Sequence, residues 1–247
     1  MVKVHKKENI INFLKVKEIE NSAIIGIITN EPQCEVLTDD EENPKGVLVK
    51  DKHFTYIYST NDDFLEELLH CQLFKSHQGF AAVSEEVFNF INSKFYYEWK
   101  SKCHVYYLNK ENILSNEGIT LDSIHLKDAV KINELYTYKD QEGLNYIEES
   151  IIKRPSAALY LNDTLVSSVM VHNNNSIGVL YTSKEYRNIG YGKKVTLDLC
   201  RKLVAKGITP VAYITEENLP ALKLIESCGF KKLGIAYWFG ISNGRKI

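Results

Sequence analysis

The sequence predicts an α/β protein of the α+β kind, and three observations carry this prediction. Short runs of β-branched and aromatic residues alternate with stretches of helical apolar spacing along the 247 residues. A β-rich run that ends at Thr182 leads through Gly190 and Gly192 into a helical pattern, so that strand, glycine loop and helix follow one another. The length suits one large or two small domains.

Composition excludes several classes of protein. The 30 Lys and Arg residues nearly balance the 32 Asp and Glu residues, which argues against a nucleic-acid-binding or membrane surface. No run of about 18 apolar residues is present, and the basic N-terminus is not followed by a secretory apolar core. The 5 cysteines are scattered without a Cys-x-x-Cys pair, which is typical of reduced cytosolic thiols and not of a zinc site. We therefore expect a cytoplasmic protein without a metal ion.

In the first half the expected order is strand, strand, strand, helix, strand, helix, strand, after a helical stretch over Glu8–Glu20. Dense β-rich runs predict strands at Ala23–Thr29, Gly46–Lys50, His53–Ser59 and Lys102–Leu108. Asn61 or Asp62 can cap one of the helices, and Ser84 can cap the other. The acidic stretch Glu31–Lys45 is expected to be a solvated loop, with a cation site or a basic partner as the alternative.

An aromatic cluster precedes the expected domain boundary. Its members are Phe95, Tyr96, Tyr97, Trp99, Tyr106 and Tyr107. We interpret it as a core between domains, with one wall of an acceptor pocket as the alternative. The polar stretch Asn109–Gly118 then separates a domain of residues 1–112 from a domain of residues 119–247.

The second half begins with two helical stretches, His125–Tyr138 and Gln141–Arg154, the second of which stops before Pro155. Strands are expected at Ala157–Leu161, Leu165–Val171, Ser176–Thr182 and Thr209–Ile214. Asn162-Asp163 predicts a hairpin turn between the first two of these strands. Gly207 closes the helix that follows Gly192.

The glycine loop has the properties of an anion site. The first N–H groups of a helix have no partner inside it, and they form the positive end of its dipole. Gly190 and Gly192 let an anion approach the backbone closely. Arg187, Lys193 and Lys194 add charge that opposes the dipole, so an anionic ligand would explain them; the alternative is an ordinary glycine turn with solvated lysines. The Walker loop and the dinucleotide fingerprint do not fit this spacing.

Two patterns carry a resemblance to a known superfamily. Arg187 to Gly192 fit the pattern Arg/Gln-x-x-Gly-x-Gly/Ala, the pyrophosphate loop of acyl-CoA enzymes. Asn218 begins a second pattern, Asn-x-x-Ala-x-x-Leu-x-x-x-x-Gly-Phe, which ends at Phe230. With both patterns in this order, residues 119–239 resemble the GNAT (GCN5-related N-acyltransferase) superfamily. The segment 154–167 resembles its glycine N-acyltransferase-like, or FR47-like, branch.

The resemblance implies the GNAT fold for the second half: a mixed, mostly antiparallel and twisted sheet flanked by helices. The first half has a parallel order of elements, but Ser59–Asp62, at the place of the loop, contains no glycine. We therefore expect the N-terminal domain to be a degenerate copy of the same fold that serves as a packing and substrate-wall domain.

The resemblance also implies the reaction, which is transfer of an acetyl or related acyl group from acetyl-CoA to a primary amine of a small molecule, by direct attack in a ternary complex. The backbone of Val179, Leu180 and Tyr181 would pair with the pantetheine arm, and Asn218 would lie beside it. The residues implied at the pyrophosphate are Arg187, Asn188, Ile189, Gly190, Tyr191, Gly192 and Lys193.

The acceptor amine must lose a proton, which for a lysine-like pKa near 10.4 costs roughly 4–5 kcal/mol at pH 7. Glu216 and Glu217 are the first candidates for the general base, and His172 is the next. The family often places a Tyr that protonates the departing sulfur where this chain has Ile225. The tyrosines that could replace it are Tyr213, Tyr237 and Tyr181.

Two other functions stay open beside the small-molecule N-acetyltransferase. A non-catalytic acyl-CoA-binding or regulatory module is motivated by Ile225. Acetylation of a protein N-terminus or lysine is the third interpretation. The acceptor, the length of the acyl chain and the choice between monomer and homodimer do not follow from the sequence.

Overall fold

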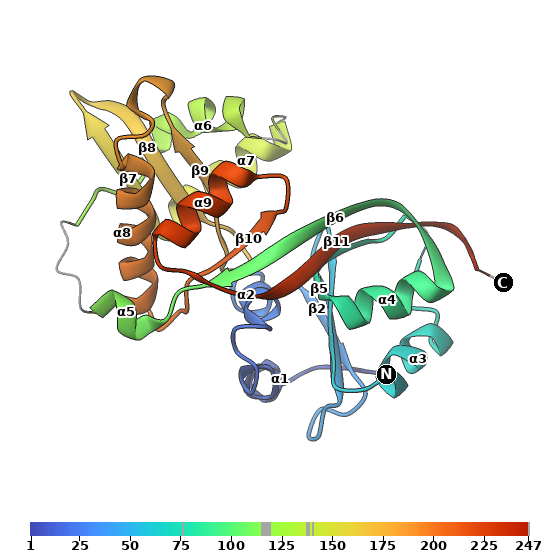
Figure 1. Ribbon diagram of the computed structural model, residues 1–247. Coiled ribbons are helices and arrows are strands. Elements are labelled where there is room, and N and C mark those ends of the chain that lie inside the picture. Colours follow the sequence, from blue (N-terminus) through green and yellow to red (C-terminus); the bar gives the residue numbers. More distant parts are fainter. Residues whose placement is uncertain (76, 115–119, 137–138, 140, 247) are drawn as a thin grey trace. The chain divides into compact units, whose positions relative to one another are not determined.

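The structure is a computed structural model that describes all residues except 76, 115–119, 137–138, 140 and 247 (Figure 1). The chain divides into two compact units. The first unit comprises Met1–Val105 together with Leu233–Ile247, and the second comprises Tyr106–Lys232. The last strand of the chain thus returns to the first unit.

The first unit is built on a mixed sheet with the strand order β1-β2-β3-β4-β5-β11-β6. Its strands are β1 (Val2–Lys3), β2 (Glu35–Thr38), β3 (Gly46–Lys50), β4 (Thr55–Ser59), β5 (Gly79–Ser84), β6 (Phe95–Tyr107) and β11 (Lys231–Arg245). Its helices are α1 (Lys7–Lys15), α2 (Ser22–Asn30), α3 (Asp62–His70) and α4 (Glu85–Lys94). β1 to β4 are antiparallel neighbours, β4 and β5 are parallel, and β5 and β11 are antiparallel.

Aromatic pairs fill the core of this unit. Phe80 of β5 stacks on Phe239 of β11 with ring centroids 4.8 Å apart. Phe88 of α4 stacks on Tyr237 at 4.2 Å. The predicted caps are confirmed, because Asn61 accepts from the N–H of Phe64 and Ser84 accepts from the N–H of Val87.

The run Ala23–Thr29, for which the sequence predicts a strand, is instead part of α2, and that prediction is wrong. The buried residues of α2 are Ala23, Ile24, Gly26, Ile27 and Ile28. In a short run that is buried almost all round, periodicity does not distinguish a helix from a strand. Asn21, at the start of α2, donates a hydrogen bond of 3.0 Å to the carbonyl of Leu14 and so holds α2 against α1.

The acidic stretch Glu31–Lys45 is not a loop throughout, because β2 lies inside it and pairs with β3. The carboxylates that follow β2 organise the turn to β3. Oδ1 of Asp39 accepts from the N–H of Lys45 at 2.9 Å, and Oδ1 of Asp40 accepts from the N–H of Glu42 at 2.8 Å.

All six members of the aromatic cluster lie on β6, which begins at Phe95 and not at Lys102. Phe95 and Tyr106 are buried, but three members of the cluster are exposed. These are Tyr96, Tyr97 and Trp99. We had expected the whole cluster to be part of a core, but these three side chains are not buried.

The second unit contains an antiparallel sheet of β7 (Ser156–Leu161), β8 (Thr164–Val171) and β9 (Ile177–Thr182). β10 (Val211–Thr215) is not part of this sheet; just before it, the carbonyl of Pro210 accepts from the N–H of Leu108 at 3.0 Å. The helices are α5 (Lys110–Leu114), α6 (Ala129–Leu135), α7 (Gln141–Lys153), α8 (Tyr191–Ala205) and α9 (Leu219–Ser227), with short 3₁₀ turns at Leu126–Asp128 and Lys184–Tyr186. The predicted hairpin turn is confirmed, since Asn162 and Asp163 have φ angles of 47° and 59°.

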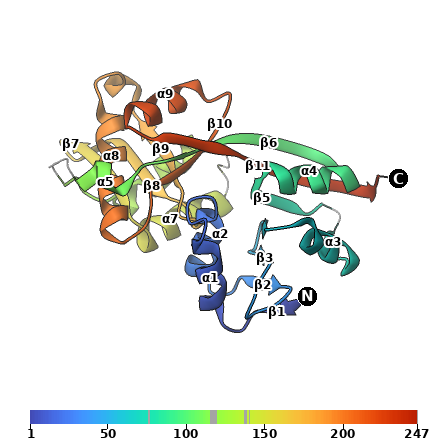
Figure 2. The same ribbon diagram turned by 60° about the horizontal axis from the view of Figure 1, so that its bottom comes forward.

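The two faces of the β7–β9 sheet carry different helices, which Figure 2 shows from a second side. On one face Ala157 and Val169 pack with Val195 and Leu199 of α8. On the other face Ala158 and Met170 pack with residues of α6 and α7, among them Ile147. Apolar residues that alternate along β7 and β8 therefore bury both faces of the sheet.

Candidate functional site

The N-terminus of α8 presents free backbone N–H groups. Gly190 is its N-cap residue, and no side chain caps this end. The first helical hydrogen bond runs from the N–H of Lys194 to the carbonyl of Gly190 at 3.0 Å. In the described part of the chain, the N–H groups of Tyr191, Gly192 and Lys193 have no acceptor. An anion that lies at this end would meet both these donors and the positive end of the helix dipole.

The loop before α8 is bent by two residues in the left-handed region. Asn188 has a φ of 62° and Gly190 has a φ of 91°. Asn and Gly are the residues that adopt this conformation at the lowest cost. Arg187 holds the loop to the end of β9, because its Nε donates to the carbonyl of Thr182 at 3.0 Å.

Aromatic rings and lysines surround the same loop. Tyr186 and Tyr191 stack with ring centroids 6.1 Å apart. Nζ of Lys194 lies 5.6 Å from the ring centroid of Tyr191, which is a cation–π distance. Lys193 and Ile189 are exposed beside them. The loop therefore combines free N–H groups with several cations.

A β-bulge interrupts β9 before it reaches the loop. Ser168 of β8 pairs with Tyr181 and Met170 pairs with Gly178, so two steps along β8 match three steps along β9. Within the bulge, Val179 has a φ of 49°. This region is strained for a β-branched residue, and such strain is concentrated at functional sites.

The other edge of β9 is open. β9 and β10 belong to different sheets. In the described residues, a single parallel bridge between Ser176 and Val211 joins the two segments. The backbone of Val179, Leu180 and Tyr181 thus has β8 on one side and no ladder on the other. An extended ligand with amide groups can pair with such an edge as an added strand does.

The second motif lies next to the first. Oδ1 of Asn218 accepts from the N–H of Ala221 at 3.2 Å and caps α9, as the sequence predicts. A Cβ atom at Gly192 would lie 3.5 Å from Cδ1 of Leu224 and 3.5 Å from Oγ1 of Thr182. The start of α8, the end of β9 and the middle of α9 therefore meet around Gly192.

The residues that the sequence suggests for acid–base catalysis lie on several separate elements. Glu216 and Glu217 are exposed in the turn between β10 and α9. Tyr213 is half-buried on β10, and the hydroxyl of Tyr181 lies 2.7 Å from Oγ of Ser183. Tyr237 is packed in the first unit, where its hydroxyl donates to Glu85 at 3.1 Å. Ile225 is 4% exposed in the core under α8 and α9.

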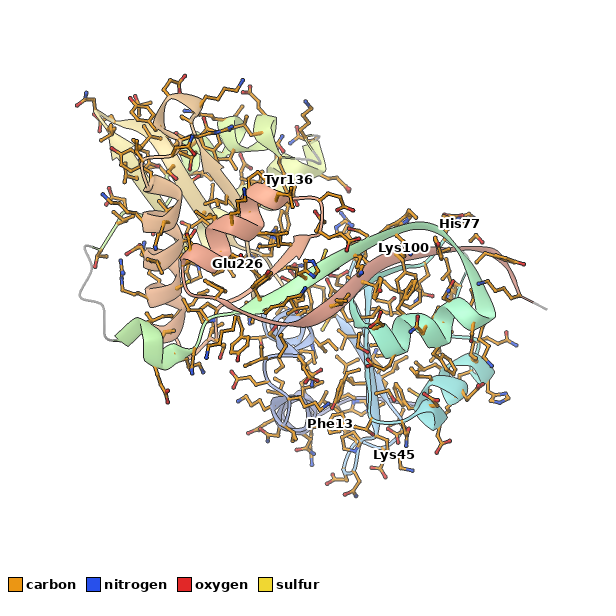
Figure 3. All side chains as sticks on the ribbon, viewed as in Figure 1. Phe13, Lys45, His77, Lys100, Tyr136 and Glu226 are labelled. Atoms are coloured by element: carbon orange, nitrogen blue, oxygen red, sulfur yellow. The ribbon has the colours of Figure 1, made fainter. Side chains whose placement is uncertain are left out.

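His172 has partners that sequence analysis missed. Its Nδ1 lies 2.7 Å from the hydroxyl of Tyr146 on α7. Burial and, after it, the positive charge of Arg154 together lower the pKa of His172 to about 4. The ring of Tyr146 stacks with that of His172 and with that of Tyr136, the latter labelled in Figure 3. The spacing of residues 146, 154 and 172 in the sequence does not indicate this cluster.

Several solved structures have a similar fold. A Drosophila protein from a structural genomics consortium superposes with a TM-score of 0.79 at 16% identity, covering 97% of each chain. An acetyltransferase of the GNAT family from Colwellia psychrerythraea has a TM-score of 0.59 at 14% identity, covering 98% of this chain and 99% of its own. A tandem GNAT protein from the clavulanic acid biosynthesis pathway has a TM-score of 0.57 at 12% identity, covering 99% of each chain. A comparison with curated proteins gives no match.

These similarities show that the chain has a tandem GNAT-like α/β fold, with mixed sheets and flanking helices as the sequence predicts. Residues 160–239 match the model of the FR47-like protein family. This match spans both motifs and confirms their resemblance to the GNAT superfamily and its FR47-like branch.

Two further observations concern membranes and metals. Within the residues that the structure describes, no helix is long and apolar enough to cross a membrane. No group of three or more His, Cys, Asp or Glu side chains lies together as a metal site in the same residues.

Proposed function

We propose that the protein is an N-acetyltransferase that transfers an acetyl group from acetyl-CoA to a primary amine of a small molecule. The observation that supports this most is the uncapped N-terminus of α8, which follows a bent loop with exposed Arg187 and Lys193. The diphosphate of coenzyme A is an anion of the size and charge that such a terminus binds. The match to the FR47-like family model adds support, because it spans the strand, the loop and the helix concerned.

The proposal gives each part of the site a task. The N–H groups of Tyr191, Gly192 and Lys193 would donate to the diphosphate, and hydrogen bonds to charged groups contribute roughly 1.5–3 kcal/mol each. The open edge of β9 would pair with the amides of the pantetheine arm. The thioester would then lie near the bulge at Val179, where the amine attacks the carbonyl carbon, the C–N bond forms and the C–S bond breaks.

Calorimetry with acetyl-CoA tests the diphosphate site. Gly190→Glu places a carboxylate at the end of α8, where a Cβ atom has no neighbour within 4 Å, and we expect the affinity to fall by more than about 100-fold because like charges repel. Gly207→Glu is a matched control at the other end of the same helix. Its φ of 76° is also positive and its surroundings are also open, so it carries the same backbone strain.

An unchanged affinity in Gly190→Glu, or an equal loss in Gly207→Glu, would contradict the assignment of the loop. Turnover is measured separately as release of free thiol from acetyl-CoA in the presence of a panel of primary amines. Thiol release that depends on one of the amines supports the transferase.

A non-catalytic acyl-CoA-binding module is the second candidate, and the burial of Ile225 favours it. The apolar side chain at this position has no proton to give to a leaving thiolate. A thiol with a pKa near 8.5 is nevertheless a fair leaving group at neutral pH, so the transferase does not require that proton. Binding of acetyl-CoA without thiol release across the whole amine panel would decide for the module.

A further inference from the structure

His172 occupies a place in the second unit where it can meet the acyl group. A Cβ atom at Gly178 would overlap Nε2 of His172, so the imidazole lies directly against the backbone of β9. Gly178 is the residue before the bulge, and its pairing partner Met170 belongs to the cluster on the α6 and α7 face. The ring therefore lies on that face, one residue from Val179.

The hydrogen bond between Tyr146 and His172 links the role of the hydroxyl to the tautomer of the imidazole. The hydroxyl oxygen of Tyr146 accepts from the N–H of Asn173 at 3.4 Å, and it lies 2.7 Å from Nδ1 of His172. In the arrangement in which the O–H of Tyr146 donates to Nδ1, the imidazole is the acceptor of this hydrogen bond. A neutral imidazole that accepts at Nδ1 carries its hydrogen on Nε2. Nε2 has no hydrogen-bond partner in the described part of the chain.

A buried cation keeps this imidazole neutral. Arg154 is 8% exposed, and its guanidinium carbon lies 5.7 Å from the ring centroid of Tyr146. Its Nε donates to the carbonyl of Val171 at 3.2 Å and its Nη2 donates to Ser150 at 2.6 Å, which fixes the charge in place. A second positive charge on His172 would be repelled by Arg154 in surroundings of low dielectric constant.

We propose that the O–H of Tyr146 donates to Nδ1 of His172 and that Nε2–H of His172 donates a hydrogen bond to the acyl oxygen of the bound thioester, with Tyr146 and Arg154 as positioning residues. This inference rests on the proposed acetyltransferase. When the amine attacks, negative charge develops on the acyl oxygen and then leaves with the sulfur as the C–S bond breaks. The surplus proton of the amine goes to solvent or to the sulfur. His172 neither gains nor loses a proton, so the proposal differs from the role of general base that the sequence suggested.

A pair of variants distinguishes a hydrogen-bond donor from a base. His172→Gln keeps an N–H donor near the place of Nε2, whereas His172→Leu has a similar volume and no donor. We expect kcat to fall roughly 100- to 1,000-fold in His172→Leu and at most about tenfold in His172→Gln, with the Kd of acetyl-CoA unchanged in both. His53→Gln, which alters an exposed histidine of the first unit, is the control and should leave kcat unchanged.

Equal losses in the Gln and Leu variants would overturn the donor role, and so would the absence of a loss in the Leu variant. Circular dichroism checks that both variants are folded. The Kd of acetyl-CoA tests the diphosphate site and does not depend on His172. Failure of this inference is thus distinguishable from failure of the proposed function.

Nuclear magnetic resonance of the imidazole nitrogens gives a readout that does not require turnover. At pH 7 the wild-type spectrum should show neutral His172 with the hydrogen on Nε2, and Tyr146→Phe should shift the population toward the other tautomer. Acetyl-CoA should move the Nε2–H signal more than coenzyme A does, because coenzyme A has no acyl oxygen. A hydrogen on Nδ1, or a signal that acetyl-CoA leaves in place while it binds, would overturn the proposal.

Discussion

The imidazole of His172 fills the space that the missing side chain of Gly178 leaves beside β9. A Cβ atom at this position would overlap the ring at Nε2 and Cδ2, so an alanine there must displace the imidazole. We expect Gly178→Ala to lower kcat by about tenfold or more, while acetyl-CoA still binds at the distant end of β9. Steady-state kinetics and calorimetry on the same preparation check this. A variant with normal kcat would show that the position of His172 does not matter for turnover.

The burial of His172 also predicts a dependence of stability on pH. Its pKa is lowered to about 4 in the folded protein, from 6.5 in the unfolded chain. The unfolded chain therefore binds more protons between these values, so the contribution to stability is present above pH 6.5 and is lost as the pH falls toward 4. We expect this group alone to lower the free energy of unfolding by roughly 2 kcal/mol between pH 7 and pH 5.

Urea unfolding of the wild type and of His172→Gln at both pH values isolates this contribution, since carboxylates titrate equally in the two proteins. The wild type should lose more stability on acidification than the variant does. If His172→Gln loses as much stability on acidification as the wild type does, the imidazole is not held neutral by its surroundings.

The sequence predicts those parts of both units whose signals depend on neighbouring residues. The caps at Asn61, Ser84 and Asn218 and the turn at Asn162-Asp163 depend on neighbouring residues, and the structure confirms them. The prediction for Ala23–Thr29 is wrong because a β-branched run buried almost all round carries no polar face that would indicate its period.

The features that the sequence does not indicate depend on residues far apart along the chain. The bulge at Val179 follows from the register between β8 and β9, which a single strand does not contain. Tyr146 and His172 meet because α7 crosses the sheet beside the turn after β8. Of the residues in this cluster, the sequence indicates only His172 as a candidate catalytic residue, because of its residue type.

Arg187 gives a test of the loop that leaves the backbone of α8 intact. Its Nε bonds to the carbonyl of Thr182, and lysine has no group that donates from this position. We expect Arg187→Lys to weaken acetyl-CoA binding about tenfold, the effect of about one hydrogen bond to a charged group, with little change in stability because the side chain is exposed.

Lys184→Met is the matched control for charge, because Lys184 is an exposed cation in the 3₁₀ turn that precedes Arg187. It removes a positive charge, whereas Arg187→Lys keeps one. Calorimetry at constant ionic strength compares the two variants. A larger loss in Lys184→Met than in Arg187→Lys would mean that general attraction, and not the geometry of Arg187, governs binding.

Asn218 has two possible tasks, and two substitutions separate them. Its Oδ1 caps α9, while its amide NH₂ group takes no part in that cap and is available to the pantetheine arm. Serine is as good an N-cap residue as asparagine but lacks the NH₂ group, and alanine lacks both functions. We expect Asn218→Ser to keep the stability within a few tenths of a kcal/mol and to weaken acetyl-CoA binding, whereas Asn218→Ala also lowers the stability by about 1 kcal/mol. Thermal unfolding and calorimetry measure the two effects; an unchanged affinity in Asn218→Ser would leave this side chain with the cap alone.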